Sequence, residues 1–469
     1  MTAAGRIDQA VADAVEWAEP LLYAQRGSEV LPFLEELIAN VSKVREAPSS
    51  LVAQLFLCHG RALAMCSLDD ERADRSFLRA GALATNEALR MQVDLYSARV
   101  HRQRGQREKE QASLERCRRR IRQATDAGLR ARVVQDLGMS AWNLADYDEA
   151  LDHFKEALRA GVRADDLRTE AHARVGCGLV RSSMGGLTEA EQDLRAARRC
   201  FARLQDETGL WQVAVHLSRV LRHQGRYSEA ARVLHPHLEA ARTAGLAYRH
   251  QVLLLERVQV EIDLQRLGEA RELLDEIEAN SSARDNSEIR STLVLARSRM
   301  LLYAQEPQEV VDRVEREFQL ARTQDRPIVA GVLQGHLGLA KAVLGERELG
   351  DDLTRDAVDL LSGSGNLPAL AEVCVCRYHT LETRQDPDMV FQPVLSWIHN
   401  EPARGVRLEQ LLASMEYALS VGATVRVRGL VGTAEGILNE LDQGLAPGDR
   451  PALAVHPWTV RLQRVLSQL

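Results

Sequence analysis

A glutamate–alanine pair recurs in this chain with an unbroken 40-residue period, as Glu149-Ala150, Glu189-Ala190, Glu229-Ala230 and Glu269-Ala270. An aromatic residue or leucine stands three residues before each alanine, and another stands four residues after it. Self-similarity at one fixed period of about 20 to 50 residues is typical of solenoids, in which each repeat packs only against its neighbours. This repeat constrains the fold more than any other feature of the sequence.

Weaker copies of the unit extend the repeat in both directions. Towards the C-terminus, Val310, Gly350 and Val390 stand where the alanine is expected, and one earlier unit centres on Ala73 after a slightly shorter step. The sequence therefore predicts about nine units between residues 52 and 400.

Each unit is predicted to contain two helices separated by a short polar turn. In the unit that contains Ala150, Gly138 lies twelve residues earlier, in the first helix. Small residues at these two positions allow the helices of one unit to approach closely, because no side chain holds them apart. Phe154 and Ala157 are predicted to face the next pair of helices.

The pattern resembles the tetratricopeptide repeat (TPR), whose small and aromatic positions match Gly138, Ala145, Tyr147, Ala150, Phe154 and Ala157. The 40-residue period is longer than that of the common TPR unit, which has about 34 residues. The pattern is therefore closer to the long-helix units in the regulatory region of MalT-type bacterial activators. The resemblance covers about three quarters of the chain and is weakest at both ends, as is typical of capping units.

The resemblance implies an all-α, right-handed superhelical solenoid of about 9 to 11 helix-turn-helix hairpins. Residues 1–50 are predicted to be N-terminal capping helices, residues 51–400 the solenoid, and residues 401–469 a degenerate repeat with C-terminal capping helices. The implied function is that of a non-enzymatic scaffold or adaptor, which holds a segment of a partner protein in its concave groove. A ligand- or peptide-sensing regulator whose solenoid changes conformation on binding remains the alternative.

The inward-facing positions of the family predict the partner-binding groove. Carried over by phase, they give Arg99, Arg102, Arg132, Asn143, His216, Arg219, Arg222, His223, Glu256 and Arg299. Such a wall suits an acidic or polar peptide, because arginine binds carboxylates through two parallel hydrogen bonds. The alternative is that some of these side chains are merely solvated. The lysine and paired asparagines of chaperone-tail receptors are absent from these positions.

A second candidate site is a basic patch within residues 99–132, a stretch with twelve basic and four acidic residues. Its centre, ERCRRRIRQA, contributes Arg116, Arg118, Arg119, Arg120 and Arg122. Because Leu114, Cys117 and Ile121 form the apolar face of this helix, the arginines are predicted to point largely to solvent. They would then either dock an acidic protein segment or pair with acids of neighbouring units.

The remaining features exclude whole classes of function. The net charge of −7 and the pI of about 6.1 argue against a nucleic-acid or membrane partner. Seven scattered cysteines indicate reduced thiols in a cytoplasmic protein. The sequence contains no phosphate-binding loop, no metal-ligand motif and no spacing that selects a catalytic triad, so neither a cofactor nor an enzymatic activity is expected. The oligomeric state is left open.

Overall fold

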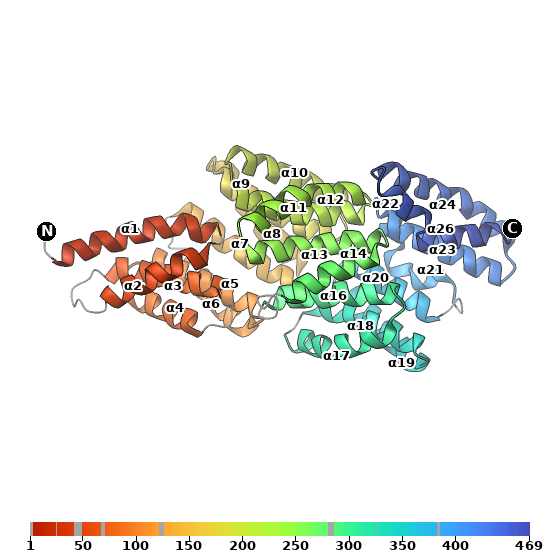
Figure 1. Ribbon diagram of the computed structural model, residues 1–469, viewed down its shortest axis with the longest axis horizontal. Helices are drawn as coiled ribbons and strands as arrows, with labels where there is room; N and C mark the ends of the chain where they lie inside the picture. Colours follow the sequence, from red (N-terminus) through yellow and green to blue (C-terminus); the bar gives the residue numbers. More distant parts are fainter. Residues whose placement is uncertain are drawn as a thin grey trace.

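The regular structure of the chain is entirely helical in the part that the computed structural model describes, which comprises residues 3–24, 26–41, 49–66, 71–121, 126–279, 286–324, 326–381 and 385–469. Within these ranges no strand occurs, and the helices follow one another as antiparallel hairpins from the N-terminal α1 to the C-terminal α26 (Figure 1). The predicted all-α solenoid of TPR-like hairpins is confirmed.

The described helices form eleven hairpins, within the predicted range. The first helices are α1 (Ala3–Tyr23), α3 (Ser49–Cys66), α5 (Glu87–Gln103), α7 (Ala127–Asn143), α9 (Leu167–Ser183), α11 (Glu207–His223), α13 (Ala247–Asp263), α16 (Ser287–Tyr303), α18 (Pro327–Val343), α20 (Leu367–Leu381) and α23 (Arg404–Ser420). The second helices are α2 (Gly27–Val41), α4 (Glu71–Leu83), α6 (Arg107–Arg120), α8 (Tyr147–Arg163), α10 (Leu187–Arg203), α12 (Tyr227–Thr243), α14 (Leu267–Ala279), α17 (Pro307–Thr323), α19 (Arg347–Ser362) and α24 (Thr424–Gly444). Three short helices complete the tenth hairpin, namely α21 (Pro387–Val390), η2 (Gln392–Val394) and α22 (Leu395–Asn400), and the chain ends with α25 (Arg450–Ala454) and α26 (Pro457–Leu466).

The 40-residue period consists of two equal halves, since from α6 to α20 successive helices begin at a constant 20-residue spacing. Most of these helices are equally long and are followed by a three-residue turn. In the turn after α7, Ala145 has a φ of 59°, its N–H donates to the Trp142 carbonyl, and the Asp146 N–H donates to the Ala141 carbonyl. These two bonds are those of a Schellman cap, which ends a helix at a left-handed residue. A left-handed residue recurs at the same position after most helices of the regular part and so sets their common length.

The small residues of the repeat allow large side chains to pack between helices. Phe154 of α8 is 2 % exposed and lies between Gly138 of α7 and Gly176 of α9. A Cβ atom added at Gly138 would lie 3.0 Å from Cζ of Phe154, and one added at Gly176 would lie 2.1 Å from its Cδ1. Ala150 and Ala157 are also fully buried. The prediction that these residues are helix contact points is confirmed by this packing.

Segments that are far apart in the sequence touch across successive turns of the solenoid. The Asn366 side-chain amide donates to the Tyr147 hydroxyl at 2.7 Å, and the Trp397 indole N–H donates to the Gly185 carbonyl at 2.8 Å. Near the N-terminus, the Tyr23 hydroxyl donates to Asp206 at 2.7 Å. The curvature of the solenoid thus brings together residues that are 183 to 219 positions apart in the chain.

Candidate functional site

The candidate site is the surface that the first helices turn towards the interior of the solenoid, here called the inner surface. Its charged side chains come from equivalent positions of α5, α7, α11, α13 and α16, and they bind one another from one helix to the next. The regular 20-residue spacing of the helices positions them, because it keeps the same face of every first helix directed inward.

At the N-terminal end of this surface, Asp136 of α7 receives two arginines from α5. Arg99 Nη2 lies 2.6 Å and Arg102 Nη2 lies 2.7 Å from the carboxylate oxygens. Burial by itself would raise the pKa of Asp136, but the two guanidinium groups lower it below its usual value. Asp136 is therefore ionised and holds α5 against α7.

Further along the chain, Asp263 of α13 has the same role. Arg222 Nη1 from α11 lies 3.0 Å from one carboxylate oxygen, and Arg299 Nη2 from α16 lies 2.5 Å from the other. Arg299 Nη1 also donates to the side chain of Gln259 at 3.0 Å. This carboxylate thus connects three successive first helices.

Glu372 of α20 continues the network, since its carboxylate lies 3.1 Å from His336 Nε2 and 3.7 Å from Arg299 Nε. Burial opposes ionisation of Glu372, yet the hydrogen bond from His336 and the charge of Arg299 lower its pKa to about 2. Four consecutive first helices, from α13 to α20, are linked in this way.

Six of the ten predicted groove residues are therefore bound within the chain, namely Arg99, Arg102, Arg219, Arg222, Glu256 and Arg299. Arg219 forms its ion pair with Glu256 of the next first helix. Neither interpretation made from the sequence, partner-facing arginines or solvated ones, included these internal pairs. Through these pairs, carboxylates of the chain itself largely neutralise the positive charge on this part of the inner surface.

The other four predicted groove residues, Arg132, Asn143, His216 and His223, are half-buried, and their side chains make no hydrogen bond or ion pair within the described part of the chain. Burial, together with the charge of Arg219, lowers the pKa of His216 to about 3, and burial beside Arg222 lowers that of His223 well below its usual value. Both imidazoles are therefore neutral at pH 7, and each can donate one hydrogen bond and accept another.

These buried histidines predict a loss of stability in mild acid. Burial lowers the pKa of His172 and His456 to about 4 and that of His216 to about 3, whereas an unfolded histidine titrates near 6.5. Below pH 6.5 the unfolded chain binds more protons than the folded one, so the free energy of unfolding falls as the pH is lowered. We expect a decrease of about 1 kcal/mol for each of these histidines between pH 7.5 and 5.5, measured by urea unfolding. Equal free energies of unfolding at the two pH values would contradict the conclusion that these histidines are buried and neutral in the folded protein.

The basic patch lies on α6, a second helix, and is separate from the inner surface. Arg116 Nε binds the Asp94 carboxylate at 2.7 Å, and Arg120 also binds Asp94. Arg119 is exposed and forms a pair with Glu115, while Arg118 is exposed and has no ion pair among the described residues. The expectation that these arginines point largely to solvent is thus incorrect for Arg120, which is held against α5, and Arg122 lies outside the described residues.

An open cleft of about 490 Å³ borders the patch between α6, α7 and α8, and its lining includes Arg118, Arg119, Glu156, Val134 and Leu137. Its lining carries Glu115 and Glu156 as well as Arg118 and Arg119, so the charge around the cleft is mixed.

The described residues contain no group of three or more histidine, cysteine or carboxylate side chains arranged to hold a metal ion. No described helix combines the length and the apolarity that crossing a bilayer requires.

No protein-family model matches the chain, and no curated protein matches it. Among solved structures, it is similar to a Rap protein complexed with Competence and Sporulation Factor, with 14 % identity, a TM-score of 0.48 and coverage of 93 % of this chain and 100 % of that one. The apo quorum sensor NprR from B. thuringiensis gives 15 % identity, a TM-score of 0.47 and coverage of 76 % and 99 %. Aspartyl phosphate phosphatase F from Bacillus subtilis gives 12 % identity and a TM-score of 0.39, with coverage of 64 % of this chain and 94 % of that one. At such identities a likeness concerns the fold alone.

Proposed function

We propose that this TPR-like solenoid is a non-enzymatic interaction scaffold that binds a segment of a partner protein on its inner surface. One observation carries the proposal: Arg132, Asn143, His216 and His223, which the phase of the repeat assigns to the inner surface, are half-buried and have no hydrogen-bond partner for their side chains among the described residues. Nδ1 of His216 is fully buried. Polar groups removed from water are normally hydrogen-bonded, so we take these four side chains to mark a place for a ligand.

The chemistry of these four side chains favours a polar segment with few charges. Neutral histidines and an asparagine match the N–H and C=O groups of a peptide backbone. Arg132 has no ion pair among the described residues and would bind a single carboxylate, whereas Arg219 and Arg222 already bind Glu256 and Asp263. The proposed partner is therefore a polar segment with one or two acidic residues, and a long acidic stretch is disfavoured.

The test compares the inner surface with the outer one in the full-length protein. The partner is first identified by affinity capture and mass spectrometry, and its affinity is then measured by calorimetry with purified components. Replacing Arg132 or His216 with alanine is expected to weaken binding about tenfold or more, because each removes a hydrogen bond from a partly buried interface. Arg118→Ala on α6 is the matched control and should leave the affinity unchanged. Equal affinities for all the variants would contradict the proposal.

A sensing regulator is the second candidate, and the contacts between successive turns favour it. Polar contacts such as Tyr147–Asn366 and Gly185–Trp397 join segments that are distant in the sequence. A ligand bound between the turns would alter these contacts. A sensor should gain thermal stability from a short peptide or a small metabolite, whereas a scaffold should gain it only from its macromolecular partner.

A further inference from the structure

The C-terminal segment, which contains α25 and α26, lies on the inner-facing side of α23, the first helix of the last hairpin. Glu409 and Glu416 are the sixth and thirteenth residues of α23, the same positions that Gln212 and Arg219 hold in α11. Helix α26 packs chiefly on α23, and α24 is not among its main contacts. In the regular units, by contrast, the helix that follows a hairpin packs closely on the hairpin's second helix, as α9 does on α8. Helix α26 is therefore displaced towards the interior of the solenoid.

Two residues of α26 bind these inward-facing glutamates. The Trp458 indole N–H donates to Glu409 Oε2 at 2.8 Å. Arg461 binds Glu416 through two nitrogens at 2.8 and 2.7 Å, and it also binds Glu409. Burial would raise the pKa of Glu409, but Arg461 and His379 lower it far below its usual value. Both glutamates therefore act as carboxylate acceptors for a tryptophan and an arginine spaced three residues apart.

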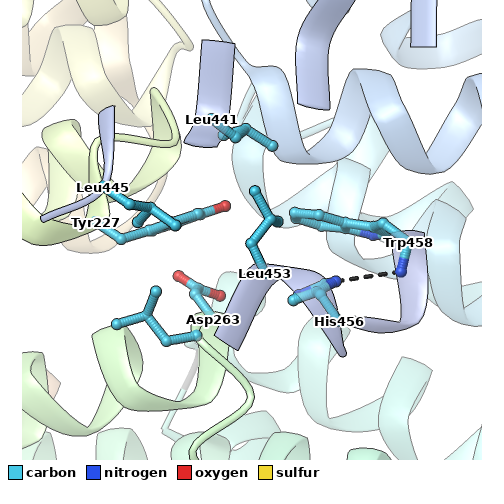
Figure 2. Close-up of a pocket in the computed structure, with 8 residues that line it drawn as sticks. Tyr227, Asp263, Leu441, Leu445, Leu453, His456 and Trp458 are labelled. Atoms are coloured by element: carbon cyan, nitrogen blue, oxygen red, sulfur yellow. Dashed lines mark hydrogen bonds between the residues drawn. The ribbon is translucent and has the colours of Figure 1, made fainter. Parts of the chain in front are cut away.

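The segment before α26 reaches across to the preceding turn of the solenoid. Asp449 accepts hydrogen bonds from Ser228 and Arg266, each at 2.5 Å. Leu453 and His456 lie beside Tyr227 and Asp263, as Figure 2 shows. The C-terminal segment thus lies between α23, the start of α12 and the end of α13.

The segment combines a small apolar anchor with several directional polar contacts. Within α26 only Leu462 and Val465 are buried, and together with Leu453 they pack into a large hydrophobic cluster, while Val460 and Leu466 are 44 % and 39 % exposed. Where the C-terminal segment meets Tyr227 and Asp263, a cavity of about 10 Å³ remains, which can hold one water molecule at most (Figure 2). Directional polar contacts with limited apolar burial are typical of exchangeable interfaces.

We propose that Glu409 and Glu416 form a docking site for an amphipathic segment with a tryptophan and, three residues later, an arginine, and that Trp458 and Arg461 occupy this site as a displaceable intramolecular ligand. The inference rests on the proposed function in that it extends binding to a second region of the same inner surface. Its consequence is that this region becomes available only when the C-terminal segment leaves or a partner with the same pattern competes for it.

The test uses the whole protein and cuts only the link between α24 and the C-terminal segment. A protease site is inserted between Pro447 and Gly448, which are both exposed, and the cleaved protein is mixed with a fluorescent peptide of residues 448–469. Fluorescence anisotropy is expected to show saturable exchange of the peptide into the cleaved protein and little uptake by the uncut one, because the covalent segment holds the site at a high effective concentration.

Two peptide variants identify the contact. A peptide with Arg461→Ala should bind more than tenfold more weakly, since it leaves Glu409 and Glu416 without their cation. A peptide with Arg464→Ala, an exposed position of the same helix, should bind like the original. The proposal is overturned if the cut fragment does not exchange, if cleavage abolishes the helical circular dichroism signal, or if the uncut protein binds the peptide equally well. None of these results bears on binding at Arg132 and His216, which is measured separately.

Discussion

Replacing Phe154 with alanine is expected to lower the free energy of unfolding by about 3–5 kcal/mol. The ring is 2 % exposed and fills the space between Gly138 and Gly176, so its removal leaves a cavity that the surrounding helices cannot close without moving. Because a solenoid is stabilised by contacts between neighbouring units, this loss should weaken the junction of α7, α8 and α9 in particular. Chemical denaturation of the purified variant measures the effect.

A substitution at Gly176 tests the same packing from the side of α9. A Cβ atom at this position would lie 2.1 Å from the Phe154 ring, so Gly176→Ala should destabilise the protein by about 1–3 kcal/mol, although alanine is the better helix former. In the Phe154→Ala background the same change should cost almost nothing. Gly268→Ala is the matched control, because no atom lies within 4 Å of the added Cβ, and it should alter stability by no more than about 1 kcal/mol. Additive effects of the two changes at 154 and 176 would contradict the described packing.

Removal of the Asp263 carboxylate is the second large effect. Asp263→Ala should cost about 3–5 kcal/mol, because Arg222 and Arg299 would then remain buried without their shared counter-charge. The exposed pair of Arg119 and Glu115 provides the control, and Glu115→Ala should change stability by less than about 1 kcal/mol. Urea unfolding at pH 7.5 compares the two variants. Similar losses would show that the inner-surface network contributes no more than a surface pair.

The sequence predicts the helices, their pairing and the packing at Phe154, because these depend on residues within one repeat or the next one along the chain. The repeat pattern does not reveal the 20-residue half-period, because the left-handed turn position is filled by Ala145, Asp165 and Gln205 as well as by glycine. Unlike glycine, alanine and glutamine have no preference for this conformation. The contacts between successive turns, such as Tyr147 with Asn366, depend on the curvature that all the intervening units add together.

The pairing of the inner-surface arginines did have a signal in the sequence. Arg99 with Asp136 and Arg219 with Glu256 share a separation of 37 residues, which is the same step along the repeat. A search for acids at that spacing would have identified both pairs. By contrast, nothing in the repeat pattern indicates that Trp458 and Arg461 bind Glu409 and Glu416 of α23, because the phase fades after residue 400.

The central claim is that a partner segment lies against the inner surface, and site-specific photocrosslinking tests it most directly. A photoreactive amino acid is placed at Asn143, on the inner surface, or at Arg118, on the exposed face of α6, and each protein is irradiated with the identified partner. The structure predicts a crosslink to one segment of the partner from position 143 and none from position 118. A crosslink from position 118, with none from position 143, would contradict the claim.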